Sequence, residues 1–543
     1  MRRFAGDRMG PGQQEECLNR TYIRPAHVAA TEAATSSRRT LTVVVTVVGT
    51  LALLVRLALH TRAFDLYGDE VIYADLGHSV RSGGFPEFFG QIFFLHGPGF
   101  FFLEAGWGRL LGNPSGLMAW VYEMRELNVL LASATAIVIT LLVTKVSTVR
   151  AGAAAGLLFA LDPFCIRQND RVLLETSMML WVLLGYLVFS PLVNQPRVRG
   201  PQIRAFGAGV LFGCAVLTKD EAALLTVVPL VATGVTLSGP RRTLIMLTIS
   251  VTVLTYAIYV AMVAVNGYFS ILWEAKTTGI QRLLGVIQVT GFHSHHGGSL
   301  SARLIAEGGY FITTYVVLVL AVPALIVVMR RGNHTQRMLA FVQCAAAITL
   351  AYAVTLGTLE EQELYLLVVP AIVTIPVAIT QPSRVTKIHR RSAQGKHRSL
   401  VWMAAGALTC MLGLNLVTCL DWLRHPDDGF TLMLAYMERH VPSGTAVDIA
   451  AGTPPPSQTD GGRYALQNLY KAQLWTTPAA LNQQHVDYIM VEWGPIQEGY
   501  AYLSSSQVGG LIHQSHSRLV FSFFGRSYGY LSLYSVPSAH KSS

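Results

Sequence analysis

Asp69 and Glu70 are adjacent carboxylates that follow the first long apolar block of the sequence. A carboxylate placed soon after a membrane-crossing helix lies at the membrane surface, where it can meet a lipid headgroup and a water-borne acceptor together. Such a group can serve as a general base that takes the proton of an acceptor hydroxyl. A solvated loop acid, or an acid near a helix N-terminus, is the structural alternative. The pair is therefore our first candidate for catalysis.

Further ionisable residues lie at the ends of later apolar blocks. Asp170 and Arg171 occupy a short polar loop, and Lys219 follows an apolar stretch. Ionisable residues near membrane depth are energetically expensive and are functional candidates by default. The cations could surround a phosphate, although Lys219 could instead snorkel to the surface or pair with Asp220 or Glu221.

Two more candidates for substrate binding, Tyr73 and His96, follow the acid pair in the same loop. Tyr73 comes three residues after Glu70, and His96 precedes a stretch rich in aromatic residues. A lone histidine in such a place is also compatible with a structural or solvated role.

A metal site is suggested only by the cluster His293, His295 and His296. Glycines follow this cluster and no acid stands at a fixed spacing from it, so we assign no metal ligand there. The six cysteines form neither a CxxC pair nor a disulfide framework. We expect no required cofactor, and leave a divalent metal open.

The composition points to a membrane protein. The chain has 543 residues, of which 52% are hydrophobic and 13% charged, whereas a soluble domain is about 25% charged. Its net charge of +10 is spread between apolar blocks rather than gathered in one patch, which argues against a nucleic-acid partner. The lipid bilayer is the expected surrounding.

Eleven apolar blocks have about the length that crosses a hydrocarbon layer of roughly 30 Å. They cover residues 41–59, 127–144, 151–166, 176–193, 205–218, 222–238, 243–265, 311–329, 338–357, 364–380 and 400–420. The shortest two, 151–166 and 205–218, are the least regular. The predicted fold class is an all-α polytopic membrane protein with a transmembrane module over residues 41–420.

Lysines and arginines set the orientation of this module. They gather in the loops at 145–150, 197–204, 241–242, 330–337 and 384–398. Basic loops face the cytoplasm, so we expect a cytoplasmic N-terminus, with residues 1–40 as a disordered leader. The odd number of crossings then places residues 421–543 outside the cell membrane.

Two outer segments have their own character. The first outer loop, residues 60–126, contains an apolar and aromatic stretch at 98–111 that we expect to form a helix lying in the membrane interface. A crossing there would put the basic loops outside. Residues 421–543, the C-terminal domain, combine turn clusters with a helical pattern at 430–440 and strand-like runs at 486–491, 519–524 and 530–536. A small α/β domain is predicted.

Over residues 41–380 the sequence resembles the glycosyltransferase C superfamily. The resemblance rests on ordered motifs: the Asp69-Glu70 pair, His96-x-Pro98 before an aromatic helix, Asp170, and Leu217-Thr218-Lys219. Within the superfamily it is nearest to the protein mannosyltransferase and lipid A aminoarabinose transferase branches, that is, to glycosyltransferase family 39. These branches use polyprenyl-phosphate sugars.

The resemblance implies roles for the candidates. Asp69 maps to the catalytic base, Glu70 would assist it or position the acceptor, and Lys219 would lie near the lipid phosphate. The sequence departs from the family where Gly97 replaces a proline. It departs again where Gly279, before Ile280-Gln281-Arg282, replaces a histidine of the aminoarabinose branch.

We predict an integral membrane glycosyltransferase that moves a hexosyl or pentosyl group, with inversion, from a polyprenyl-phosphate donor to an extracytoplasmic hydroxyl. The acceptor could be a protein, a lipid or a cell-wall glycan. A sugar phosphate has a good leaving group, so the reaction needs a base and cations rather than a general acid. The alternatives are a polytopic transporter, whose charges would lie in mid-helix, and a membrane-anchored binding or assembly protein of the cell envelope.

Overall fold

The computed structural model describes residues 38–88, 90–112, 117–194, 199–287, 291–293, 299–381, 390–452 and 469–537. The chain divides into two compact units, residues 1–47 and 48–543. Of the first unit only the start of the helix Arg38–Leu59 is described. The expected leader, residues 1–40, therefore lies almost wholly outside the described residues.

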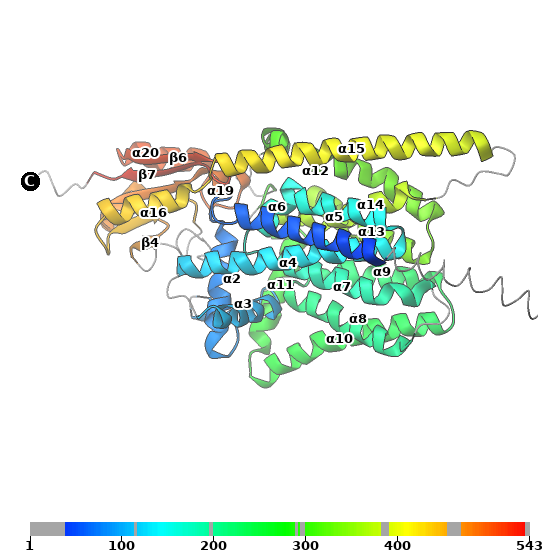
Figure 1. The fold of residues 1–543 in the computed structure, drawn as a ribbon. Coiled ribbons are helices and arrows are strands. Elements are labelled where there is room, and N and C mark those ends of the chain that lie inside the picture. The colour runs from blue at the N-terminus through cyan, green and yellow to red at the C-terminus, as the bar shows by residue number, and fades with distance from the viewer. Residues whose placement is uncertain are drawn as a thin grey trace, which may run out of the picture. The chain divides into compact units, whose positions relative to one another are not determined.

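The predicted apolar blocks all overlap helices (Figure 1). In the part of the chain that the structure describes, nine helices are long and apolar enough to cross a membrane, and a bent pair makes a tenth. The shorter apolar helix α9 (Ala222–Thr236) accounts for the remaining block. The others are α4 (Leu117–Val146), α5 (Val149–Leu161), α6 (Pro163–Asn169), α7 (Leu174–Asn194), α8 (Pro201–Thr218), α10 (Pro240–Val265), α12 (Leu300–Arg331), α13 (His334–Thr355), α14 (Glu361–Ile379) and α15 (Arg390–Arg424).

The bent pair consists of α5 and α6, which meet at 61°. Asp162 ends α5 and caps α6, because its carboxylate accepts a hydrogen bond from the backbone N–H of Cys165 at 2.9 Å. Pro163 stands at the first position of α6, where its missing N–H does no harm. The expected single crossing at 151–166 is thus broken at Asp162, and α6 ends at Asn169, directly before Asp170.

The first outer loop folds into α2 (Gly68–Ser79), a 3-10 turn (Val80–Ser82), a hairpin of β1 (Glu87–Phe88) and β2 (Gln91–Ile92), and α3 (Gly99–Leu110). The expected helix at 98–111 is α3. A further helix, α11 (Phe269–Leu283), follows α10. Since α2 begins at Gly68, both acids of the pair stand in its first turn.

The C-terminal domain contains a five-stranded mixed sheet in the order β4-β3-β5-β7-β6. Its strands are β3 (Ala446–Ile449), β4 (Lys471–Gln473), β5 (Tyr488–Glu492), β6 (Arg518–Gly525) and β7 (Gly529–Ser535), and its helices are α16 (Gly429–His440), α18 (Pro478–Gln483), α19 (Trp493–Glu498) and α20 (Ser505–Gln514). β3 is parallel to β4 and β5, whereas β7 is antiparallel to β5 and β6. The predicted helix and three strand-like runs correspond to α16, β5, β6 and β7.

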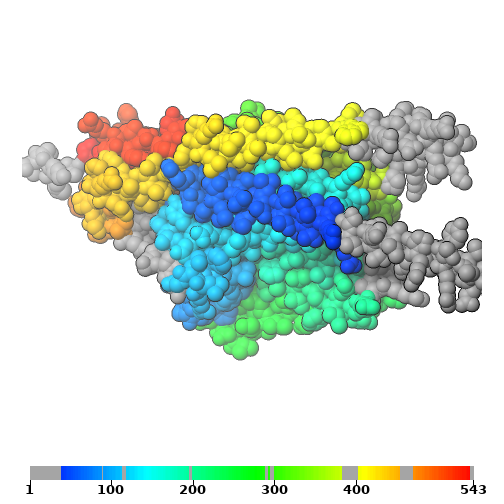
Figure 2. Space-filling view, viewed as in Figure 1, coloured from blue at the N-terminus to red at the C-terminus, as the bar shows by residue number. Residues whose placement is uncertain are grey.

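One hydrophobic cluster joins α2, α3 and α4 with α16 and the strands β3 and β7 of the C-terminal domain. The domain is therefore packed on the first outer loop. By contrast α15, yellow in Figure 2, lies at the surface of the molecule. Trp402, Met403 and Val417 are each more than half exposed, which is the pattern of a helix that faces lipid.

Candidate active site

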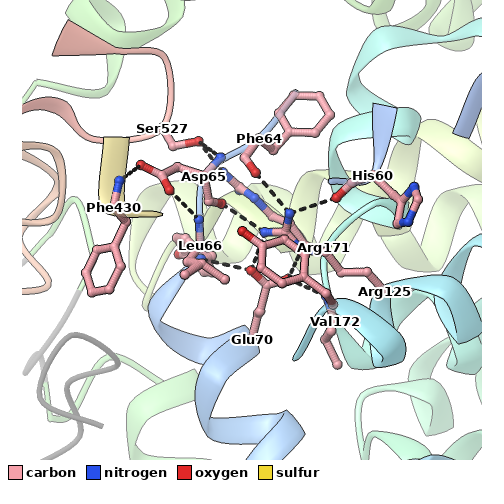
Figure 3. A network of polar contacts seen from close by, with 12 residues as sticks. His60, Phe64, Asp65, Leu66, Glu70, Arg125, Arg171, Val172, Phe430 and Ser527 are labelled. Carbon is pink, nitrogen blue, oxygen red and sulfur yellow. Dashed lines mark hydrogen bonds and ion pairs between the residues drawn. The ribbon is translucent and has the colours of Figure 1, made fainter. Parts of the chain in front are cut away.

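Glu70 and Arg125 form a fully buried ion pair at the centre of the first outer loop (Figure 3). Arg125 donates to the two carboxylate oxygens of Glu70 through Nε at 2.8 Å and Nη2 at 2.5 Å. The same oxygens accept from the backbone N–H groups of Tyr67 at 3.1 Å and Val172 at 2.9 Å. Four donors thus occupy Glu70, a geometry that positions backbone rather than an acceptor substrate.

Arg125 also fixes the chain that leads to α2. It donates to the backbone carbonyls of His60 at 2.8 Å, Phe64 at 3.0 Å and Asp65 at 3.1 Å. The residue was absent from our sequence candidates. A lone arginine just ahead of the apolar block 127–144 was the available signal, and nothing in the sequence named its partner.

Asp69 has a different environment, although it is the next residue. Neighbouring positions on a helix point about 100° apart, so Asp69 turns away from Arg125 and stays half-buried. Burial, and next the charge of Glu360, raises the pKa of Asp69 from 3.8 to about 6, against the opposing charge of Arg282. No ion pair neutralises it within the described residues.

Three cations, Lys219, Lys276 and Arg282, gather around His96, and the charge of Arg282 also reaches Asp69; each cation is held by a carboxylate. Lys219 pairs with Glu175 at 2.5 Å and with Glu221 at 3.3 Å. In addition, Lys276 of α11 lies 2.5 Å from Asp220, and Arg282 of the same helix lies 2.8 Å from Glu360. The pairing of Lys219 with Glu221 is one of the alternatives that the sequence left open; Lys276 and Arg282 were not among our candidates.

Tyr73 and His96 join this group. The hydroxyl of Tyr73 lies 3.3 Å from Nε2 of His96. Burial, and then the charges of Lys219, Lys276 and Arg282, hold the pKa of His96 well below its usual value, so the imidazole stays neutral. Burial and the charge of Asp69 raise the pKa of Tyr73. The structure therefore brings together Asp69, Tyr73, His96 and Lys219.

Asp170 and Arg171 lie outside that group. Asp170 is fully buried, and neither of its oxygens has a hydrogen-bond partner among the described residues. Arg171 stacks over the ring of Tyr67 at 4.7 Å and donates to the hydroxyl of Ser527 in the C-terminal domain at 3.2 Å. Their expected role in binding the donor stays a prediction. The contact of Arg171 with Ser527 is that of a residue that joins the C-terminal domain to the bundle.

A second charged network connects the bundle with the C-terminal domain. Arg167 bridges Glu307 and Glu361, each at 2.8 Å, and Arg303 bridges Glu307 and Glu498 of α19, again at 2.8 Å. Sequence reasoning missed these residues because their partners are far apart along the chain.

The histidine cluster is only partly described. Nε2 of His293 lies 2.7 Å from the carbonyl oxygen of Val354, whereas His295 and His296 are outside the described residues. Within the described part of the chain no group of three histidines, cysteines or acids could hold a metal ion.

Comparison with known proteins gives a consistent result. Residues 109–284 match the family model described as dolichyl-phosphate-mannose-protein mannosyltransferase, while no curated protein matches the sequence. The fold is similar to that of ArnT from Cupriavidus metallidurans bound to undecaprenyl phosphate, with 12% identity, a TM-score of 0.57, and coverage of 91% of this chain and 98% of ArnT. It is also similar to the oligosaccharyltransferase AglB from Archaeoglobus fulgidus in complex with an inhibitory peptide and a dolichol-phosphate, with 11% identity, a TM-score of 0.56, and coverage of 93% and 74%. The chain therefore has the glycosyltransferase C fold that the sequence resemblance predicted.

Proposed function

We propose that this multi-pass membrane protein transfers a sugar from a polyprenyl-phosphate donor to a hydroxyl group on the outer side of the cell membrane. The observation that carries the proposal is the divergence of the two adjacent acids. Glu70 is neutralised by Arg125, whereas Asp69 is left half-buried with a raised pKa beside a group of cations. When two neighbouring carboxyl groups have such different environments, one can be reactive while the other is structural.

In the proposed reaction Asp69 takes the proton of the acceptor hydroxyl. The hydroxyl oxygen then attacks the anomeric carbon as the bond from that carbon to the phosphate oxygen breaks. The polyprenyl phosphate leaves with the bonding electrons, and one displacement inverts the anomeric centre. A base with a pKa near 6 is mostly ionised at neutral pH and so is ready to accept the proton.

The phosphate would bind where Lys219, Lys276 and Arg282 gather. Each of these cations is already held by a carboxylate, so each is oriented before the donor arrives. A phosphate approaching Lys219 would replace the longer contact, that with Glu221 at 3.3 Å, more easily than the 2.5 Å contact with Glu175. Such preset cations stabilise the charge that grows on the leaving group.

The solved relatives support the choice of donor, since ArnT was captured with undecaprenyl phosphate and AglB with a dolichol-phosphate. The basic-loop pattern supports an outer acceptor and a cytoplasmic N-terminus. A hexosyl or pentosyl group is the finer proposal, as is a protein, a lipid or a cell-wall glycan as acceptor.

A transfer assay tests this function. Purified protein in lipid nanodiscs is supplied with a panel of radiolabelled polyprenyl-phosphate hexoses and pentoses, together with envelope extract as acceptor. We expect label to move to an acceptor from at least one donor, and Asp69→Asn to slow the movement by about 10²–10⁴-fold. If no donor gave transfer while the protein carried a labelled solute across a sealed membrane, the protein would be a transporter and the proposal would be wrong.

A further inference from the structure

An open basic cavity of about 400 Å³ lies at the surface of the first outer loop, at the opposite end of α2 from Asp69. Its lining consists of His78, Ser79, Arg81, Ser82 and Arg109. About ten residues of helix, or roughly 15 Å, separate it from the acid pair. It is therefore distinct from the proposed catalytic group.

The cavity is built on a rigid aromatic support. Trp120 is fully buried, and its indole packs on Gly108 of α3, where a Cβ would overlap the ring. The guanidinium of Arg81 lies 5.2 Å from the Trp120 ring centroid, and the ring of His78 meets the indole edge-on at 5.2 Å. Arg81 is thus held in place by stacking rather than by a carboxylate.

The charge of this cavity is not neutralised. The other arginines of the outer loop segment, Arg62 and Arg125, are paired with acids. Among the described residues, Arg81 and Arg109 form no ion pair, and Nε of Arg81 is buried without a hydrogen-bond partner. Arg109 donates instead to the backbone carbonyl of Arg81, which brings two uncompensated guanidinium groups to one place.

The exposed side chains of α3 indicate which surroundings the cavity faces. Phe102, Leu110 and Leu111 of this helix and its C-terminus are 48%, 79% and 42% exposed. Arg109 and Leu110 follow Phe102 by seven and eight residues, a helical spacing that places them on the same face as Phe102. An exposed apolar face flanked by arginine is typical of a helix lying at the membrane surface, with the cation at the depth of the lipid headgroups.

We propose that the cavity binds the phosphate of an anionic phospholipid headgroup. Two guanidinium groups can donate in a bidentate manner to phosphate oxygens, and the serine hydroxyls and His78 can complete the contacts. The lipid chains would lie along the exposed face of α3. The site serves lipid recognition and does not depend on the proposed transfer reaction.

Lipid titration followed by native mass spectrometry tests the site. The full-length protein in detergent is titrated separately with phosphatidylglycerol and with phosphatidylcholine, and the apparent Kd of the first bound lipid is measured. We expect the anionic lipid to bind more tightly. The Arg81→Gln/Arg109→Gln variant should bind phosphatidylglycerol roughly 30-fold more weakly, since each basic residue near an anionic headgroup contributes about fivefold.

A matched control removes the same charge elsewhere. Arg439 and Arg518 of the C-terminal domain are exposed and, like Arg81 and Arg109, form no ion pair among the described residues, so Arg439→Gln/Arg518→Gln should bind as the unaltered protein does. Arg109→Gln alone, at an exposed position, should weaken binding about fivefold and guards against misfolding of the double variant.

Equal losses of phosphatidylglycerol affinity in the two double variants, or unchanged binding in Arg109→Gln, would overturn the proposal. So would equal affinity of the unaltered protein for both lipids. It would also be overturned if inorganic phosphate occupied the site and phosphatidylglycerol could not displace it. The last result would identify a site for a free phosphate.

Discussion

Glu70→Gln is expected to destabilise the protein, because it removes one charge from a buried ion pair. Both side chains of the pair are fully buried, and Glu70 accepts four hydrogen bonds. Breaking such a pair from one side leaves an uncompensated charge and costs about 3–5 kcal/mol. Three backbone carbonyls still accept from Arg125, so we expect the lower end, about 3 kcal/mol.

Thermal unfolding in detergent, followed by intrinsic fluorescence, measures this loss. Glu70→Gln should lower the melting temperature by several degrees, whereas Glu87→Gln, at an exposed glutamate of the same loop, should leave it unchanged. Adding Arg125→Gln to Glu70→Gln should cost less than the sum of the two single changes, because both break the same pair. If Glu70→Gln melted normally and yet abolished sugar transfer, Glu70 would act in the chemistry and our separation of the two acids would be refuted.

Three other predictions concern the remaining candidates. Lys219→Ala should raise the KM for the donor and lower kcat together, because its charge is felt by the bound phosphate and more strongly by the leaving one; steady-state kinetics checks both values. Arg303→Gln should leave overall stability within about 1 kcal/mol, since the contact with Glu498 is partly exposed, while hydrogen exchange in α19 should rise. Single cysteines in place of Asp460 and Arg391 should react with a membrane-impermeant reagent from outside and from inside the cell, respectively, and the reverse pattern would contradict the proposed orientation.

The membrane helices were predictable from sequence because the bilayer leaves few choices. A segment of about twenty apolar residues must satisfy its backbone internally, so hydropathy alone locates it. The break between α5 and α6 was less visible: Asp162 and Pro163 are adequate signals for a helix start, but they stand inside an apolar block. The short strands β3 and β4 have only four and three residues, too few for an alternating pattern to be recognised.

The sequence predicted which residue types form the candidate site, but not which of them form ion pairs with one another. The sequence predicted that Asp69, His96 and Lys219 lie in loops on the same side of the membrane, and the structure places these residues in one group. What the sequence could not show is that Arg125, 55 positions after Glu70, neutralises that acid and not its neighbour. Likewise Lys276 and Arg282 come from α11, and only tertiary packing brings their charges close enough to act on His96.

Asp69→Asn has an expected effect on stability that is opposite to that of Glu70→Gln. Burial raises the pKa of Asp69 from 3.8 to about 6, so the folded state favours the protonated acid. Ionisation of Asp69 therefore lowers the free energy of unfolding as the pH rises from 3.8 to about 6. Above pH 6 the full loss is at most about 3 kcal/mol, and screening by solvent makes it smaller. Because asparagine cannot ionise, the variant should melt at the same or a higher temperature than the unaltered protein at pH 8.

The most direct measurement is sugar transfer by purified Asp69→Asn in lipid nanodiscs, with donor binding measured in parallel. Turnover should fall by about 10²–10⁴-fold, the usual contribution of a positioned base, while the donor still binds. In the unaltered protein, kcat/KM should rise with pH through an apparent pKa of about 6, because only the deprotonated carboxylate accepts the proton. Near-normal turnover in Asp69→Asn would show that Asp69 is not the base and would contradict the mechanism proposed here.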